Sequence, residues 1–395
     1  FVNMKGRKID RGKSAFILTF DFFVLTSIFT ELRNDNHPYD LGTGTYGAVL
    51  GFESEDDENK GVAVKKYLNP FRTDKTAQRC FRELQLLRSL RHENIVKMKF
   101  AYTASGSRTD PYSIYLVTEY AGADLRQRLN FEVKKQEFTL QHFKRMLSDL
   151  LRALKYINSA NVIHRDLKPS NLAISDAGKL TLLDFGMARS FKRNESLTSD
   201  PLGTSVYRAI ETFGVWNFSD SSNNEQRMAI YDEKADMWSI GAILCEMITG
   251  DVLFNIDKDR ITAKDVIRKN IEICGPIPEA VINRTEKEDV RQWFNKENEN
   301  ARPRIDFVNY LRKHGRTWLQ EEIEAEKEAI EDFINRTLVF DQNDRMSVDE
   351  ALSHPFLASE RVEKEEVVAV HQIQDEEPRT IEEWQQRIWD IIHNE

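Results

Sequence analysis

Cysteine is scarce in this sequence: its 395 residues contain three, Cys80, Cys245 and Cys274, widely spaced and outside any metal-binding motif. This excludes a disulfide-stapled fold and favours a reducing, intracellular compartment. A surplus of positive charge is also missing, because 65 acidic residues outnumber 56 basic ones and give a net charge of −9. That balance argues against nucleic acid or an anionic membrane as the main partner.

The apolar stretch near the amino terminus is too short to cross a bilayer, which takes about 20 residues. It covers 15 residues, 16–30, is interrupted by Asp21 and follows a basic stretch. A basic stretch followed by an apolar one resembles a secretory signal, but no small-residue cleavage site comes after it. We therefore interpret residues 1–38 as an extension of unknown role that packs on the main fold.

The remaining composition, 40% hydrophobic and 31% charged, is that of a globular chain with two or three folding units. Strand patterns come early, at 39–66 and 114–118, with a helical pattern at 76–90 between them. From residue 141 onward the apolar spacing is mostly helical. The order predicts an α+β protein with two lobes, in which a small antiparallel sheet with one main helix precedes a larger helical lobe.

A glycine-rich string, LGTGTYGAV, runs from Leu41 to Val49. Gly42, Gly44 and Gly47 allow the backbone to approach phosphate oxygens without side-chain clashes. A hairpin that binds nothing fits the string equally well. A dinucleotide fold, and with it an oxidoreductase, does not, because a strand rather than a helix follows.

Lys65 lies on an apolar strand pattern, Val62–Lys65, where a charge is costly unless it is paired. Glu83 comes eighteen residues later, on the apolar side of the predicted helix, among Leu84 and Leu87. We expect these two charges to pair. The alternative is two unrelated surface charges.

The most informative string is VIHRDLKPSN, from Val162 to Asn171, followed by LDFG at 183–186. Asp166 can accept a proton from an attacking hydroxyl, and Lys168 can hold a phosphoryl group in transfer. Asn171 and Asp184 supply oxygen ligands suited to Mg²⁺. The order of glycine loop, strand lysine, helix glutamate, HRD and DFG matches the protein-kinase signature set.

With these motifs the chain, from about residue 39 to 357, resembles a eukaryotic protein kinase. Within that family it is most similar to a divergent mitogen-activated protein kinase of the stress-activated branch. The strings that carry the likeness are Asn69-Pro-Phe71, RELQLLRSLRHENIV at 82–96, YLVTEYAGADL at 115–125, HRDLKPSNLAI at 164–174 and TIEEW at 380–384. Lys168-Pro169 resembles serine/threonine rather than tyrosine kinases.

The resemblance implies roles for individual residues, with ATP and Mg²⁺ as cofactors. The implied nucleotide site consists of Leu41, Gly42, Gly44, Gly47, Val49, Ala63, Lys65, Thr118, Glu119, Asp124 and Leu172; the metal ligands are Asn171 and Asp184; the catalytic set is Asp166, Lys168, Lys65 and Glu83. Asp236 is implied as the buried anchor of the catalytic loop. Glu211 and Arg345 are implied as a buried ion pair.

The activation segment, residues 184–211, departs from the family. Aligned from Glu211, Ser199 stands at the family's phosphorylated threonine and Pro201 at its tyrosine. The first arginine for that phosphotyrosine is replaced by Ser205, whereas the second, Arg208, is present. Arg79, Arg165 and Arg189 match the phosphothreonine pocket. We therefore expect activation at a single site, Ser199 or Thr198, where a phosphate would attract the arginines; the alternative is an ordinary surface turn.

The predicted organisation has four parts: the extension 1–38, a small lobe 39–120, a large lobe 121–358, and a C-terminal extension 359–395 that packs on the kinase. Expected partners are protein substrates and an upstream kinase, recruited through docking motifs by Glu363, Glu365 and Glu366, or else these glutamates are merely solvated. We expect a monomer in the cytoplasm, with the nucleus as a second location. The competing function is a weak pseudokinase or scaffold; the intact set of catalytic residues favours an active enzyme.

Overall fold

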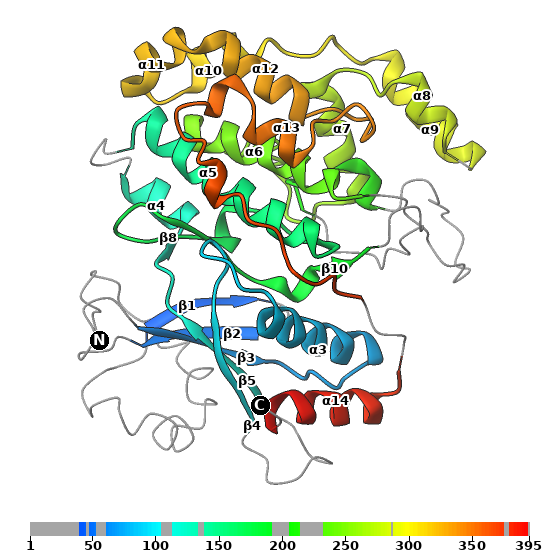
Figure 1. Cartoon of the computed structure of the whole chain (residues 1–395). Coiled ribbons are helices and arrows are strands. Elements are labelled where there is room, and N and C mark those ends of the chain that lie inside the picture. Colours follow the sequence, from blue (N-terminus) through cyan, green and yellow to red (C-terminus); the bar gives the residue numbers. More distant parts are fainter. Residues whose placement is uncertain are drawn as a thin grey trace. The chain divides into compact units, whose positions relative to one another are not determined.

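The computed structural model describes residues 39–44, 47–52, 61–103, 113–132, 138–191, 205–213, 232–285, 287–374 and 379–393. These residues form two compact units (Figure 1). The first unit contains the described residues up to Arg91, those in Val96–Ala121 and the C-terminal helix. The second unit contains His92–Ile95 and the described residues from Gly122 to 374. The predicted extension 1–38 lies outside the described residues.

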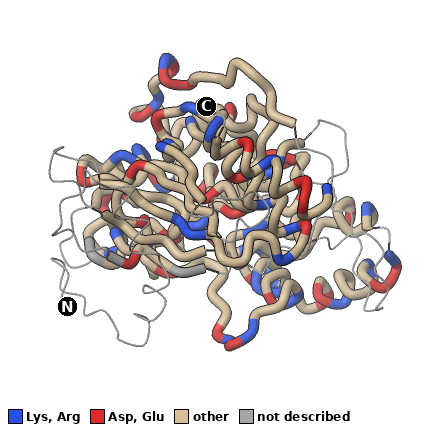
Figure 2. The backbone as a smooth tube through the Cα atoms, turned by 90° about the horizontal axis from the view of Figure 1, so that it is seen from below, with Lys and Arg blue, Asp and Glu red and all other residues tan. Residues whose placement is uncertain are grey.

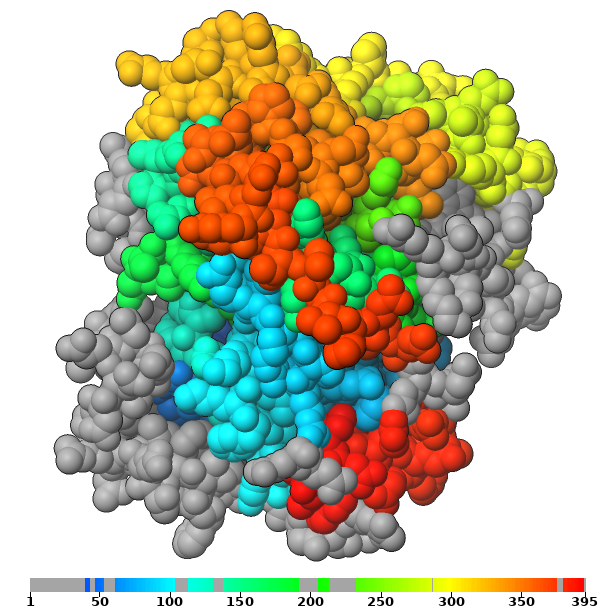
Figure 3. Space-filling model, in the orientation of Figure 1, coloured from blue at the N-terminus to red at the C-terminus, as the bar shows by residue number. Residues whose placement is uncertain are grey.

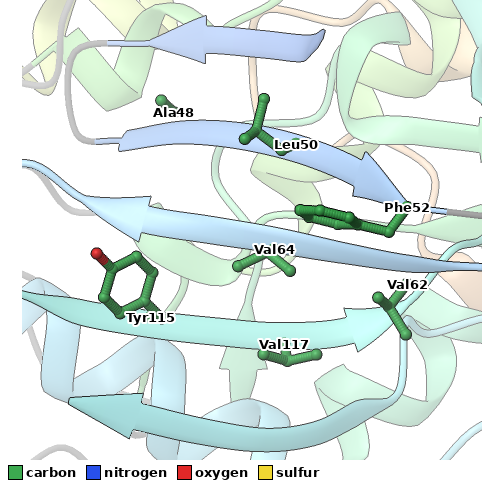
Figure 4. Packing of buried hydrophobic residues seen from close by; sticks show 7 residues of the cluster. All are labelled: Ala48, Leu50, Phe52, Val62, Val64, Tyr115 and Val117. Atoms are coloured by element: carbon green, nitrogen blue, oxygen red, sulfur yellow. The ribbon is translucent and has the colours of Figure 1, made fainter. Parts of the chain in front are cut away.

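The first unit is built on an antiparallel sheet of five strands in the order β1-β2-β3-β5-β4. The strands are β1 (Tyr39–Gly44), β2 (Gly47–Phe52), β3 (Val62–Tyr67), β4 (Met98–Thr103) and β5 (Ile114–Glu119). One cluster of buried side chains holds β2, β3 and β5 together (Figure 4), and it consists of Ala48, Leu50, Phe52, Val62, Val64, Tyr115 and Val117. Five of its seven residues are β-branched or aromatic, so the strands agree with their local propensity.

Helix α3 (Asp74–Ser89) follows β3 and begins with a capping box between Thr73 and Thr76. The C-terminal helix α14 (Ile381–His393) packs against it (Figure 1) and contributes to the surface coloured red in Figure 3. Trp384 is 1% exposed, and its ring lies 5.1 Å from that of Phe81. A segment about 300 residues away in the chain therefore covers the outer face of α3.

The second unit is mostly helical around two buried helices, α5 (Leu140–Ser159) and α6 (Lys234–Thr249). Every residue of α6 from Ala235 onward is buried, which explains its nearly unbroken apolar sequence. A Cβ at Gly241 would lie 2.5 Å from Thr337 Oγ1, so only glycine permits this approach. The other helices are α4 (Leu125–Glu132), α7 (Ala263–Cys274), α8 (Glu279–Asn283), α9 (Glu288–Glu299), α10 (Phe307–His314), α11 (Gln320–Ala325), α12 (Lys327–Thr337) and α13 (Val348–Leu352).

Pairs of short strands flank the loops of the second unit. The pairs are β6 (Ala123–Asp124) with β8 (Leu172–Ile174), β8 with β9 (Leu180–Leu182), and β7 (Val162–Ile163) with β10 (Arg189–Ser190). Single helical turns follow at η1 (Pro169–Asn171), η2 (Phe185–Met187) and η3 (Ile210–Phe213). Asp166, Lys168, Asn171 and Asp184, which are the predicted catalytic and metal-binding residues of this unit, lie in these connections.

The α+β class predicted from the sequence is confirmed, with a five-stranded sheet early in the chain and helices later. The structure divides the expected C-terminal extension 359–395: its described residues up to 374 belong to the second unit, whereas α14 belongs to the first. In the described part of the chain, no helix has the length and apolarity to cross a membrane.

The ion pair expected between Glu211 and Arg345 is present in the second unit. Arg345 NH1 lies 2.6 Å from Glu211 Oε1, and the side chains are 0% and 2% exposed. The guanidinium also donates to the carbonyl oxygens of Val339 and Lys234. The pair thus fixes the last residue of the activation segment to the helical core.

Replacing Arg345 by methionine should lower the free energy of unfolding by about 3 to 5 kcal/mol, because it leaves the Glu211 carboxylate buried and unpaired. The matched control is Arg336→Met, which removes an exposed pair with Glu350 and should cost at most about 1 kcal/mol. Urea denaturation followed by tryptophan fluorescence measures both. Equal losses in the two variants would show that the burial of the pair has no consequence.

Candidate active site

The first unit holds a buried pair between a strand and a helix. Lys65 Nζ lies 2.6 Å from Glu83 Oε1 and 2.8 Å from Oε2, so both carboxylate oxygens accept from the ammonium. The lysine and glutamate side chains are 15% and 3% exposed. Because a charge in such a place is expensive unless it is paired, the two residues hold each other in position. The pairing predicted from their spacing is therefore present.

A third residue, missed by the sequence analysis, completes this group. Tyr67 donates its hydroxyl to Glu83 Oε2 over 2.8 Å. Tyr67 lies two residues after Lys65 on β3, and alternate residues of a strand point to the same face. That periodicity could have indicated Tyr67. Its partner on α3 could not be read from the sequence.

The catalytic-loop string of the second unit is anchored on one buried carboxylate. The backbone N–H groups of His164 and Arg165 donate to Asp236 Oδ2 and Oδ1, both over 2.8 Å. Burial raises the pKa of Asp236, and the two donors oppose that shift by stabilising its charged form. Arg165 takes a left-handed backbone conformation with φ of 66°, which these two bonds maintain.

Asp166 follows this anchored turn, and its carboxylate is held from several sides. Lys168 Nζ lies 2.7 Å from Asp166 Oδ2. The Asn171 amide donates to the Asp166 carbonyl oxygen over 2.8 Å and to Oδ2 over 3.2 Å. On the other oxygen, Arg208 NH2 lies 2.8 Å from Oδ1. The carboxylate is thus fixed in direction and surrounded by donors.

The two predicted metal ligands are brought close together through the backbone. Leu183 N donates to the Asn171 carbonyl oxygen over 2.9 Å, which places Asp184 beside Asn171. Asp184 has a left-handed φ of 54°, and its Oδ1 accepts from Gly186 N. One amide and one carboxylate fit Mg²⁺, which binds few protein ligands and completes its shell with water and phosphate.

The ring of Phe185 is fully buried and stands edge-on to the ring of His164, 5.2 Å between centroids. His164 Nε2 also lies 2.9 Å from the Leu183 carbonyl oxygen. The catalytic loop and the segment with Asp184 are therefore packed on each other within the second unit. Because both rings are fully buried, their packing fixes the direction of the two segments relative to each other.

The expected nucleotide-site residues fall into two sets, one in each unit. In the first unit, β1 carries Leu41, Gly42 and Gly44, β2 carries Gly47 and Val49, β3 carries Ala63, and β5 carries Thr118 and Glu119. Gly42 pairs with Val49, and Ala63 with Thr118, in the sheet register. In the second unit, Asp124 on β6 lies opposite Ala173, next to Leu172 on β8. Burial raises the pKa of Asp124, and the N–H of Gln127 donates to its Oδ1.

The three arginines expected around a phosphate also belong to different units. Arg79 lies on α3 in the first unit, whereas Arg165 and Arg189 belong to the second. Arg165 Nε donates to the Met187 carbonyl oxygen over 2.7 Å. Thr198 and Ser199, the expected phosphorylation sites, lie outside the described residues.

Comparison with known proteins identifies the family that uses this arrangement. The model of the protein kinase domain matches residues 37–357. The chain belongs to the protein kinase family. The kinase is 33% identical over 363 residues to mitogen-activated protein kinase pmk-3 of Caenorhabditis elegans, an alignment that covers 90% of this chain and 71% of the relative.

Other relatives point to the same branch. The kinase is 32% identical to mitogen-activated protein kinase 12 of Mus musculus, with 87% of this chain and 84% of the relative covered. It is 33% identical to mitogen-activated protein kinase hog-1 of Neurospora crassa, with 88% and 83% covered. The resemblance inferred from the sequence is confirmed: the chain is a serine/threonine protein kinase of the mitogen-activated type.

Replacing Tyr67 by phenylalanine should lower kcat/KM for ATP about 3- to 10-fold, because Glu83 loses a hydrogen bond to its charged form and holds Lys65 less firmly. The control is Tyr102→Phe on β4, whose ring packs against the strand cluster and which should leave kcat/KM unchanged. Steady-state phosphorylation of a peptide at varied ATP measures both. A wild-type value for Tyr67→Phe would show that the hydroxyl does not support the pair.

Proposed function

We propose that this kinase transfers the γ-phosphoryl group of Mg²⁺-ATP to serine or threonine hydroxyls of proteins. The observation that carries the proposal is the state of Asp166: a buried carboxylate, aimed by Lys168 and Asn171, in a loop anchored on Asp236. A carboxylate held in this way can orient a substrate hydroxyl and accept its proton.

Asn171 and Asp184 would hold the metal ion, because the backbone bond from Leu183 to Asn171 joins their segments and their side-chain oxygens are of the type that Mg²⁺ prefers. When bound, Mg²⁺-ATP supplies the phosphoryl group and neutralises part of its charge. Lys65, kept in place by Glu83, would hold phosphate oxygens of the nucleotide. Lys168 is one-third exposed beside Asp166, so it can follow charge that moves towards the substrate oxygen.

The alternative, a scaffold that binds partners with little turnover, draws on the altered activation segment. The contacts in the described residues weigh against it. The pair between Lys65 and Glu83 and the contact between Lys168 and Asp166 each keep charges buried or half-buried, at a cost that a scaffold does not need to bear. We therefore favour an active enzyme.

We also propose activation by one phosphate, at Ser199 or Thr198, by an upstream kinase. Arg165 and Arg189 of the second unit support this, because Arg189 on β10 pairs with Ile163, two residues before Arg165 in the catalytic loop. A monomeric state and a cytoplasmic and nuclear location stay predictions from the sequence.

We propose that docking depends mainly on one of the three acidic residues Glu363, Glu365 and Glu366. Glu366 is 6% exposed and paired with Lys155 at 3.0 Å and Arg361 at 2.8 Å. Glu365 lies 3.4 Å from Arg152. Glu363 is 78% exposed and is the residue of the three best able to meet a basic partner.

Apolar residues follow Glu363 in the chain. Val367, Val368 and Val370 are exposed on the segment coloured orange-red in Figure 3. A partner that combines basic and apolar residues fits this surface. Over the backbone as a whole, basic and acidic residues are interspersed (Figure 2).

Radiolabelled ATP and a generic basic protein test the enzymatic proposal. Wild-type kinase should transfer label, and Asp166→Asn should lower the rate by at least about 100-fold, because the variant cannot accept the proton. Removing divalent cations with EDTA should abolish transfer, and Mg²⁺ should restore it. Equal labelling by wild type and Asp166→Asn would refute the proposal.

Charge reversal at Glu363 tests the docking proposal with a labelled peptide of alternating basic and leucine residues. Glu363→Lys should raise the Kd about 3- to 10-fold at low salt and less than about 2-fold at 0.5 M salt, because an exposed charge is screened. The control is Glu299→Lys, an exposed glutamate at the end of α9. If both variants bind the peptide as the wild type does, Glu363 is not part of a docking surface.

A further inference from the structure

Arg208 turns back from the end of the activation segment onto the catalytic loop. Its Nε donates to the Arg165 carbonyl oxygen over 3.2 Å, and its NH2 lies 2.8 Å from Asp166 Oδ1. Arg208 is 5% exposed and Asp166 is 7% exposed. The contact is therefore a largely dry, two-point attachment of a guanidinium to the residues that carry the proposed catalytic base. A planar guanidinium suits such a fixed geometry.

At rest, this attachment covers one of the two oxygens through which Asp166 would act as a base. Oδ2 already accepts from Lys168 and Asn171, and Oδ1 accepts from Arg208. A substrate hydroxyl must approach one of these oxygens to within about 3 Å. In the proposed function Lys168 and Asn171 stay in contact with Oδ2, beside the phosphoryl group and the metal, so Oδ1 is the oxygen left for the hydroxyl. Arg208 lies on that oxygen.

The backbone on both sides of Arg208 is fixed to the core. The Arg208 side chain can therefore leave Asp166 Oδ1 while the backbone stays in place. Ser239 on α6 donates its hydroxyl to the Tyr207 carbonyl oxygen over 2.7 Å. Tyr207 donates its own hydroxyl to Glu246 Oε2. Burial, followed by the negative charge of Glu246, raises the pKa of that hydroxyl, which therefore stays protonated as a donor. On the far side, Glu211 is held by Arg345.

The sequence bears on why this guanidinium contacts the catalytic loop. The resemblance assigned Arg208 to a phosphotyrosine, and Pro201 stands where that tyrosine would be. A buried arginine is costly without an opposite charge nearby, and a carboxylate of the catalytic loop supplies one. Asp166 is the carboxylate that its NH2 contacts.

We propose that Arg208 masks the catalytic base of this kinase: its guanidinium occupies Asp166 Oδ1 at rest and must leave that oxygen before a substrate hydroxyl can bind there. The proposal rests on the proposed function, because it gives that function its regulation. An anion that attracts the guanidinium away from Asp166 unmasks the base, while Lys168 and the backbone anchors stay in place.

The test compares phosphatase-treated wild type, Arg208→Gln and Arg312→Gln, with radiolabelled ATP and a generic basic protein. Arg312 is an exposed arginine paired with Glu324, so its variant makes the same chemical change outside the site. Arg208→Gln should raise kcat about 5- to 50-fold with little change in KM for ATP, because the base is unmasked and the nucleotide contacts are kept. Arg312→Gln should match the wild type. Adding Asp166→Asn to Arg208→Gln should abolish the gain.

Arg208→Lys keeps the test decisive if circular dichroism shows that the glutamine variant does not fold. A lysine preserves the charge but cannot reach the Arg165 carbonyl and Asp166 Oδ1 together, so kcat should rise by a smaller factor, about 2- to 5-fold. A kcat at or below the wild-type value in the folded variant overturns the proposal, since it shows that Arg208 supports the base.

Wild-type kinase that keeps its phosphates is measured in parallel. Label transfer by this sample, without a gain in the Arg208 variants, counts against the mask alone. No transfer by any sample, with or without phosphatase, counts against the proposed function itself. A gain in Arg208→Gln that disappears with Asp166→Asn supports both.

Discussion

The buried carboxylate of Asp236 is the constraint on which the second unit's chemistry depends. It accepts the N–H groups of two successive residues, His164 and Arg165, and so dictates the turn from which Asp166 projects. An aspartate at the start of a wholly buried helix is expensive, and the bonds offset that cost only if the loop takes one conformation. The rigidity of the base therefore originates in α6.

Several charged side chains of this kinase form buried or half-buried ion pairs. Breaking such a pair costs free energy, because it leaves a charge unpaired in the interior. Lys65 pairs with Glu83, Arg345 with Glu211, and Asp166 with both Lys168 and Arg208. Each cation of the first two pairs has one carboxylate partner among these pairs. Asp166 differs because it holds two cations, so one can leave without leaving the carboxylate unpaired. A carboxylate that contacts two cations can exchange one of them for a substrate hydroxyl and still keep an ion pair.

The C-terminal residues show how folding changes the meaning of a charged sequence. Glu363, Glu365 and Glu366 look equivalent in the sequence, yet Glu366 is buried against Lys155 and Arg361, and Glu363 projects into solvent. Farther along the chain, α14 belongs to the first unit and packs against α3, where the ring of Trp384 contacts that of Phe81. One short extension thus supplies an ion-pair clamp, an exposed patch and a cover for the helix that carries Glu83.

The sequence by itself determined the α+β class, the pair between Lys65 and Glu83, and the string from His164 to Asp184, because local pattern and motif spacing encode them. It did not indicate Tyr67 as a partner of Glu83, the unequal burial of the glutamates, or Arg208 on Asp166. Those contacts join residues from separate elements, and their geometry depends on how the elements pack and on which buried charge finds an opposite one nearby. Only the tertiary structure decides that.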